Sequence, residues 1–281
     1  MSDNEGLSGL DPKPNPLLRR GFVQGVLVAG AVAFTGPGLF NAMQGLGNAG
    51  GSDPSVAAAM NATLYATFAF FGCLSGLLFN TLGARTLMSF GSLTYAFYSI
   101  SVYLWGQVDS RFAGMAIASA AVLGIGAACL WESQGTMTLS YALEKEKGGF
   151  FGMFWFIFNL GGVIGGLITL GINLHQDEGA TSIHPSTYFT FCGLMVFGAI
   201  VALFLVINPS RVIKSDGSSV VFEKSHGVAE TKEEIVTIGR LFTNKNMLLL
   251  TPLIVQSNWF YTYEFGGING LLFDAPTRGL V

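Results

Sequence analysis

The stretch AGMAIASAAVLGIGAACL, residues 113–130, decides the class of fold. It contains no charged side chain and lacks the alternation of polar and apolar residues that marks a β-strand. A bilayer core of about 30 Å needs roughly 20 apolar residues in a helix, so this stretch predicts a transmembrane helix. Hydrocarbon offers no hydrogen-bond partners, and a helix pairs its backbone groups internally. A closed barrel would need short alternating segments instead.

Composition extends this prediction to most of the chain. Hydrophobic residues make up 51% of it and charged residues only 11%, against about 25% charged residues in soluble domains. Seven stretches are long and apolar enough to span a bilayer. The predicted spans are Gly21–Met43, Val56–Leu82, Thr86–Gln107, Phe112–Gln134, Gly149–Leu174, Thr187–Ile207 and Met247–Phe273. The fold class is therefore an all-α, polytopic membrane bundle.

Charge excludes some functions and predicts an orientation. The net charge of −3 offers no basic face for nucleic acid, and the three cysteines show no metal or disulfide spacing. Lysine and arginine gather before the first span and in alternate loops after it, whereas the opposite side offers Arg111 and Arg278. Positive residues favour the cytoplasmic side, so the N-terminus and the long central loop are predicted to be cytoplasmic. The compartment, plasma membrane or an internal membrane, stays open.

The predicted organisation has five parts. These are a polar tail at 1–20, six spans at 21–207, a central loop at 208–246, a seventh span at 247–273 and a terminal tail at 274–281. Within the loop, Ser210–Ser225 is polar and expected to be unstructured. A capping-box pattern at Thr231–Glu234 then predicts a short amphipathic helix. Six spans, a long loop and one more span are the arrangement expected of a twelve-span bundle cut after its midpoint; a seven-helix protein is the alternative.

Glycine and proline mark two expected features of the helices. Gly36-Pro37-Gly38 lies inside the first span, where proline removes a helix hydrogen bond. Either a local adjustment of a long helix or a break beside a cavity fits this pattern. Gly161–Gly166 holds two small-xxx-small pairs, which predict close packing against another helix, and Gly72 with Gly76 predicts the same in the second span.

The segment between the second and third spans resembles a known signature. Gly76, Gly83 and Arg85 match the loop pattern of the major facilitator superfamily, and Asn80 stands where that family usually has aspartate. In the family this loop gates movement between two six-helix halves. The resemblance implies a facilitator-type N-terminal half, with these four residues as candidates for the gate.

Two further stretches resemble the Uncoordinated-93-like branch of that superfamily, particularly its fungal members. They are residues 36–47, GPGLFNAMQGLG, and residues 124–135, GIGAACLWESQG, followed by FWFIFNLG at 154–161. The resemblance covers nearly the whole chain. It implies a facilitator fold without enzymatic activity or cofactor, and either transport or ion-channel regulation.

Polar residues within the spans are the candidates for a substrate cavity. Glu132 and Glu264 are acids at membrane depth, where ionisable groups usually face a bundle interior or water. Solvation near the interface is the alternative for Glu132. Asn41, Gln44 and Asn159 are uncharged, and each either binds a solute or joins two helices by a hydrogen bond.

Two functions follow from these observations. The first is facilitated transport of an unidentified small solute. The second is an accessory or ion-channel regulatory role with the same fold, through a membrane-protein partner or a homodimer. No catalytic motif is visible in the sequence, which argues against an enzyme.

Overall fold

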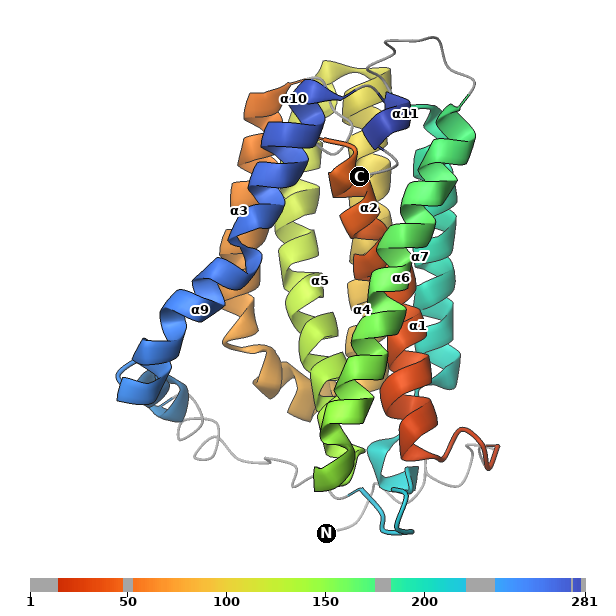
Figure 1. The fold of residues 1–281 in the computed structure, drawn as a ribbon, viewed down its shortest axis with the longest axis vertical. Helices are drawn as coiled ribbons and strands as arrows, with labels where there is room; N and C mark the ends of the chain where they lie inside the picture. The colour runs from red at the N-terminus through yellow and green to blue at the C-terminus, as the bar shows by residue number, and fades with distance from the viewer. Residues whose placement is uncertain (1–14, 48–52, 175–182, 221–235, 274, 279–281) are drawn as a thin grey trace.

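The computed structural model describes residues 15–47, 53–174, 183–220, 236–273 and 275–278. These residues form an all-α bundle, which confirms the predicted fold class (Figure 1). Five helical segments are long and apolar enough to cross a membrane. They are Val23–Gly45, Pro54–Gly72, Ser110–Ser140, Glu144–Asn173 and Pro185–Leu205.

The first span stays helical throughout, despite its proline. It consists of η1 (Val23–Val28), α1 (Ala29–Ala33), η2 (Phe34–Gly38) and α2 (Leu39–Gly45). Pro37 lies in η2, where the helix widens to π-type turns and its flanking residues keep right-handed helical backbone angles. A widened turn accommodates the missing amide without exposing backbone to hydrocarbon. The local adjustment is therefore what forms, and the helix does not break.

The second predicted span is shorter than its hydropathy suggested. Helix α3 (Pro54–Gly72) ends ten residues before the predicted boundary at Leu82, and residues 75–82 turn away from it (Figure 1). They form the first part of α4 (Ser75–Tyr103), which bends at Gly83 with φ 76°. A positive φ is easily adopted only by glycine, so Gly83 permits this corner.

Helix α4 packs between α5 (Ala113–Ser140) and α7 (Pro185–Leu205) and contains the predicted third span except for its last four residues. Its hydropathy is lower than that of the five segments above, because buried hydroxyl residues face its neighbours. Ser99 donates to the carbonyl of Tyr188 at 3.3 Å, and Thr94 and Ser101 donate to carbonyls of their own helix. Two short turns, η4 (Leu104–Val108) and η5 (Ser110–Phe112), lead into α5.

Helix α6 (Lys147–Asn173) follows the short turn η6 (Glu144–Glu146), and α7 leads to η7 (Pro209–Arg211). The segment after η7 is folded, contrary to the expectation for Ser210–Ser225. Ile213 accepts from the amide of Gly21 at 2.8 Å and donates to the carbonyl of Arg19 at 2.7 Å. Val212 and Val220 are buried. The polar composition of this segment predicted disorder, because composition carries no information about backbone pairing with distant residues. Residues 221–225 lie outside the described part of the chain.

The seventh predicted span corresponds to α9 (Lys245–Thr262), η8 (Tyr263–Asn269) and α10 (Gly270–Leu272), followed by α11 (Ala275–Arg278). Asn269 donates to the carbonyl of Gly45 at 3.3 Å, and Arg278 to that of Leu46 at 3.1 Å. These bonds attach the far end of the segment to the end of α2. The capping box at 231–234 lies outside the described residues, whereas residues 236–241 are helical.

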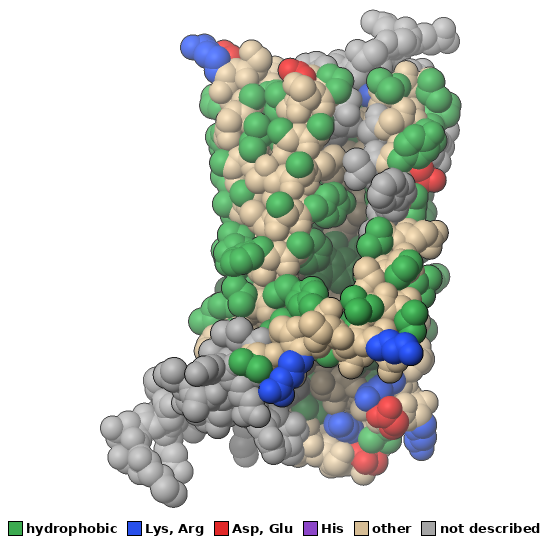
Figure 2. All heavy atoms as spheres, turned by 90° about the vertical axis from the view of Figure 1, so that its left-hand side faces the viewer, with side chains coloured by type: hydrophobic (Ala, Val, Ile, Leu, Met, Phe, Trp, Pro, Cys, Tyr) green, Lys and Arg blue, Asp and Glu red, His purple; other side chains and the backbone are tan. Residues whose placement is uncertain are grey.

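Charged side chains gather at the two ends of the molecule, and hydrophobic ones cover the middle of the face seen in Figure 2. The same view shows a hollow between columns of helices, with hydrophobic side chains at its back. This distribution is what a membrane-spanning bundle requires.

Glycines allow the helices of the bundle to touch. A methyl group added at Gly38 would lie 2.8 Å from the carbonyl oxygen of Phe158 and 2.9 Å from the Cα of Gly161. A methyl group added at Gly161 would likewise meet the carbonyl oxygen of Phe34. The predicted close packing is confirmed for Gly161, but it is wrong for Gly72, which has open space around it.

We expect Gly161→Ala to destabilise the bundle by about 1–3 kcal/mol, because its methyl group meets backbone that cannot rotate away. Gly152→Ala is the matched control on the same helix, since Gly152 has no neighbouring atom within 4 Å. The thermal midpoint of the purified protein in detergent measures both. Equal midpoints for the two variants would contradict the glycine contact.

Candidate functional site

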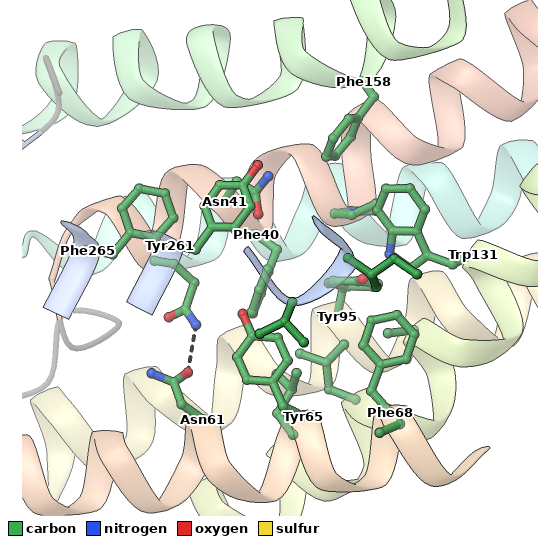
Figure 3. Close-up of a pocket in the computed structure, with 18 of the residues that line it drawn as sticks. Phe40, Asn41, Asn61, Tyr65, Phe68, Tyr95, Trp131, Phe158, Tyr261 and Phe265 are labelled. Atoms are coloured by element: carbon green, nitrogen blue, oxygen red, sulfur yellow. Dashed lines mark hydrogen bonds between the residues drawn. The ribbon is translucent and has the colours of Figure 1, made fainter. Parts of the chain in front are cut away.

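A cavity of about 890 Å³ opens inside the bundle (Figure 3). It lies between the first span, α3, α4, α5, α6 and the segment α9–η8. Its volume is in the range of about 300–1,000 Å³ that small-molecule sites occupy. The lining residues are Pro37, Phe40, Asn41, Gln44, Asn61, Leu64, Tyr65, Phe68, Ala69, Tyr95, Leu123, Ala127, Trp131, Trp155, Phe158, Ile254, Val255, Tyr261 and Phe265.

Each wall of the cavity is one face of a helix. The lining residues of α3 are spaced by three or four along the chain, and so are those of the first span and of α5. Such spacing places side chains on a single face of an α-helix. The cavity is thus built from complete helical faces, which the surrounding packing holds in place.

Aromatic rings dominate these faces. The ring of Phe158 lies 5.3 Å from that of Trp131 and 5.2 Å from that of Trp155, in edge-on geometry. Phe40 meets Tyr95 at 5.5 Å on the opposite part of the wall. Edge-to-face pairs at these distances are favourable beyond the area they bury, so they hold the rings in fixed orientations.

Three amides supply polarity to the cavity. Gln44 donates from Nε2 to Oδ1 of Asn61 at 2.9 Å, which joins α2 to α3 (Figure 3). Asn41 lies next to this pair and makes no hydrogen bond within the described part of the chain. Two of the predicted cavity residues, Asn41 and Gln44, therefore come together here.

The other three predicted cavity residues lie outside the lining. Glu132 accepts from Ser75 at 3.5 Å and from Thr136 at 3.1 Å, and it is not a lining residue although its neighbour Trp131 is. Asn159 is exposed and donates to the carbonyl of Trp155 at 2.8 Å. Glu264 is exposed on η8.

The four predicted gate residues lie along the first part of α4 and its corner. Gly76 and Asn80 are half-buried, and Gly83 forms the bend. Arg85 donates from Nε to the carbonyl of Val206 at 2.7 Å. The arginine of the signature loop thus caps the end of α7.

A buried glutamine completes this cap. Gln24 is fully buried; its Nε2 donates to the carbonyl of Leu205 at 2.9 Å, and its Oε1 accepts from the amide of Ile207 at 3.2 Å. The last carbonyls of a helix have no partner within the helix. Side chains of η1 and α4 satisfy these groups at the end of α7, and so join three helices.

Sequence reasoning missed most of the aromatic lining and the amide of Asn61. The signal was present in α3, where Asn61, Leu64, Tyr65 and Phe68 share one helical face. In a membrane helix an aromatic face is equally suited to lipid, so periodicity alone does not distinguish a cavity wall from an outer surface.

Known proteins resemble the chain over most of its length. A family model described as "Ion channel regulatory protein UNC-93" matches residues 58–263. UNC93-like protein 1 of Arabidopsis thaliana is 39% identical over 90% of this chain and 54% of its own length. An UNC93-like protein of Schizosaccharomyces pombe is 37% identical over 90% of this chain and 49% of its own.

A third relative has a different kind of name. The notoamide biosynthesis cluster protein O' of Aspergillus versicolor is 30% identical over 95% of this chain and 57% of its own length. The chain therefore spans about half the length of the curated relatives it matches. No solved structure matches it.

We expect Gln24→Leu to destabilise the protein by about 1–3 kcal/mol, because it leaves the carbonyl of Leu205 and the amide of Ile207 without their partner. Gln256→Leu makes the same chemical change at an exposed position of α9 and should leave the thermal midpoint unchanged. A midpoint for Gln24→Leu equal to that of the control would show that the cap contributes nothing.

Proposed function

This chain belongs to the UNC-93 family, and from that premise we propose that it regulates another integral membrane protein, in the first instance an ion channel. The family match carries this proposal. An enzymatic role has no support, since no cluster of metal-ligating side chains occurs in the described residues and the relatives are not named as enzymes.

The exposed face of α6 supports a protein partner. Gly148, Gly149 and Gly152 are exposed near the start of this helix and have open space above them. Small residues let the backbones of two membrane helices approach closely, which is a main source of attraction where water is absent. This face suits either a channel subunit or a second copy of this chain, and we propose the channel subunit as the partner.

A second candidate function is facilitated transport of an organic solute, and the aromatic cavity favours it. Substrate sites of transporters lie between packed helices near the middle of the bilayer. The name of the Aspergillus relative, which refers to a biosynthesis cluster, also suits a membrane protein that handles an organic molecule.

Two variants separate the candidates. In cells lacking the protein, complementation with the wild-type chain should change the whole-cell ionic conductance, and Gly152→Leu should reduce that change at least severalfold by blocking helix contact. Gly171→Leu, at an isolated open glycine of α6, is the matched control. If the change in conductance persists in Gly152→Leu but is lost in Asn41→Leu, the cavity carries the function, and transport becomes the favoured candidate.

We also propose that the N-terminus is cytoplasmic, because of the distribution of lysine and arginine. In a cysteine-free background, Arg111→Cys should react with an impermeant maleimide in intact cells. Lys145→Cys should react only after permeabilisation, since both side chains are exposed but lie at opposite ends of α5 and its flanking turns. The reverse labelling pattern would invert the assigned topology.

A further inference from the structure

We propose that the cavity binds an uncharged, flat aromatic molecule that carries an amide- or lactam-type donor and acceptor on one edge. The inference deepens the second candidate function, because it rests on the cavity being a ligand site. It does not require that the bound molecule be moved across the membrane.

The shape of the ligand follows from the rings that face each other across the cavity. Tyr65 and Phe68 project from α3, whereas Phe158 projects from α6 on the opposite wall (Figure 3). Trp131 and Trp155, whose ring centres are 6.1 Å apart, close the cavity beside Phe158. Rings arranged in this way offer both faces and edges to a flat guest, and each aromatic pair contributes about 0.5–1.5 kcal/mol beyond its buried area.

The absence of charge selects a neutral ligand. None of the described lining residues is aspartate, glutamate, lysine, arginine or histidine. Glu132, which follows the lining residue Trp131, points its carboxylate to Ser75 and Thr136 instead. Glu264 is exposed on η8 and is not among the lining residues. An ion entering the cavity would lose its hydration without meeting an opposite charge, which is costly.

The aromatic walls treat the two signs of charge differently. Ring faces carry partial negative charge and so repel an anion. They attract a cation, but by only about 0.5–2 kcal/mol per ring, and no carboxylate among the described lining residues adds to that attraction. A neutral guest has no such desolvation cost to offset, so the cavity favours it over both ions.

The polar edge of the ligand follows from hydrogen-bonding groups that remain unused. After Gln44 donates to Asn61, the Oε1 of Gln44 and the Nδ2 of Asn61 have no partner among the described residues, and the same is true of the whole amide of Asn41. Gln44 is buried, and Asn41 and Asn61 are half-buried. Polar groups inside a bundle are normally paired, so these donors and acceptors indicate a guest with a complementary edge.

Three probes with the same fused rings test the charge and the polar edge. They are phenanthridin-6(5H)-one, which is a neutral lactam with its N–H and C=O on one edge, 5-methylphenanthridinium, which is a cation, and phenanthridine-6-carboxylate, which is an anion at pH 7. Equilibrium dialysis of the purified full chain in detergent, against protein-free micelles, measures the binding of each by its own absorbance. We expect phenanthridinone to bind at a single site, at least tenfold more tightly than either ion. Tighter binding of either ion, or no saturable binding of phenanthridinone, would overturn the proposal.

Variants locate the bound probe. Asn41→Leu should weaken phenanthridinone binding about tenfold, because one hydrogen bond to the lactam is lost. Asn159→Leu makes the same change as Asn41→Leu at an exposed position and should have no effect. Equal affinities for Asn41→Leu and Asn159→Leu would place the probe elsewhere and refute the site.

These outcomes are separate from those of the proposed function. Dialysis measures equilibrium binding, so a failure of transport in proteoliposomes leaves the ligand site intact. Conversely, a chain that changes conductance but does not bind phenanthridinone would retain its regulatory role and lose only this inference.

Discussion

Hydrocarbon offers no hydrogen-bond partner to the backbone, and the rest of this structure depends on that constraint. It accounts for the helical class of fold, and it also explains the places where helices are imperfect. The turn around Pro37 widens so that the chain remains helical. At the end of α7, the side chains of Gln24 and Arg85 donate hydrogen bonds to backbone carbonyls. These polar side chains therefore satisfy backbone hydrogen-bonding groups of a neighbouring helix.

Close packing and the cavity are two results of the same arrangement. The first span touches α6 where Gly38 meets Gly161, and the neighbouring residue Phe158 projects its ring into the cavity from that contact. Small residues thus bring the backbones together at one point, while large aromatic residues one turn away line the open volume. The contact at Gly38 and Gly161 therefore sets the spacing of the first span and α6, which are two walls of the cavity.

Five of the seven predicted spans coincide with helices long and apolar enough to cross a membrane, but hydropathy did not predict where the chain turns. The boundary between α3 and α4 was missed because residues 73–82 are as apolar as the helix before them. The folding of 212–220 was missed because it depends on pairing with Arg19 and Gly21, nearly two hundred residues earlier. Asn41 and Gln44 could be predicted as cavity residues from their polarity. Asn159 could not be placed, since the contact at Gly161 sets which face of α6 turns inward, and Asn159 lies on another face.

The widened turn at Pro37 also sets the rotational register of the first span. In an α-helix each residue advances the side chains by about 100°, so adding or removing one residue redirects everything that follows. Phe40, Asn41 and Gln44 all lie beyond this turn and share the face that lines the cavity. A single-residue deletion within 34–38 would swing all three away together, with little change in hydropathy. The length of this short segment therefore fixes which side chains line the cavity, and homologues that differ in length there would present a different wall to the same volume.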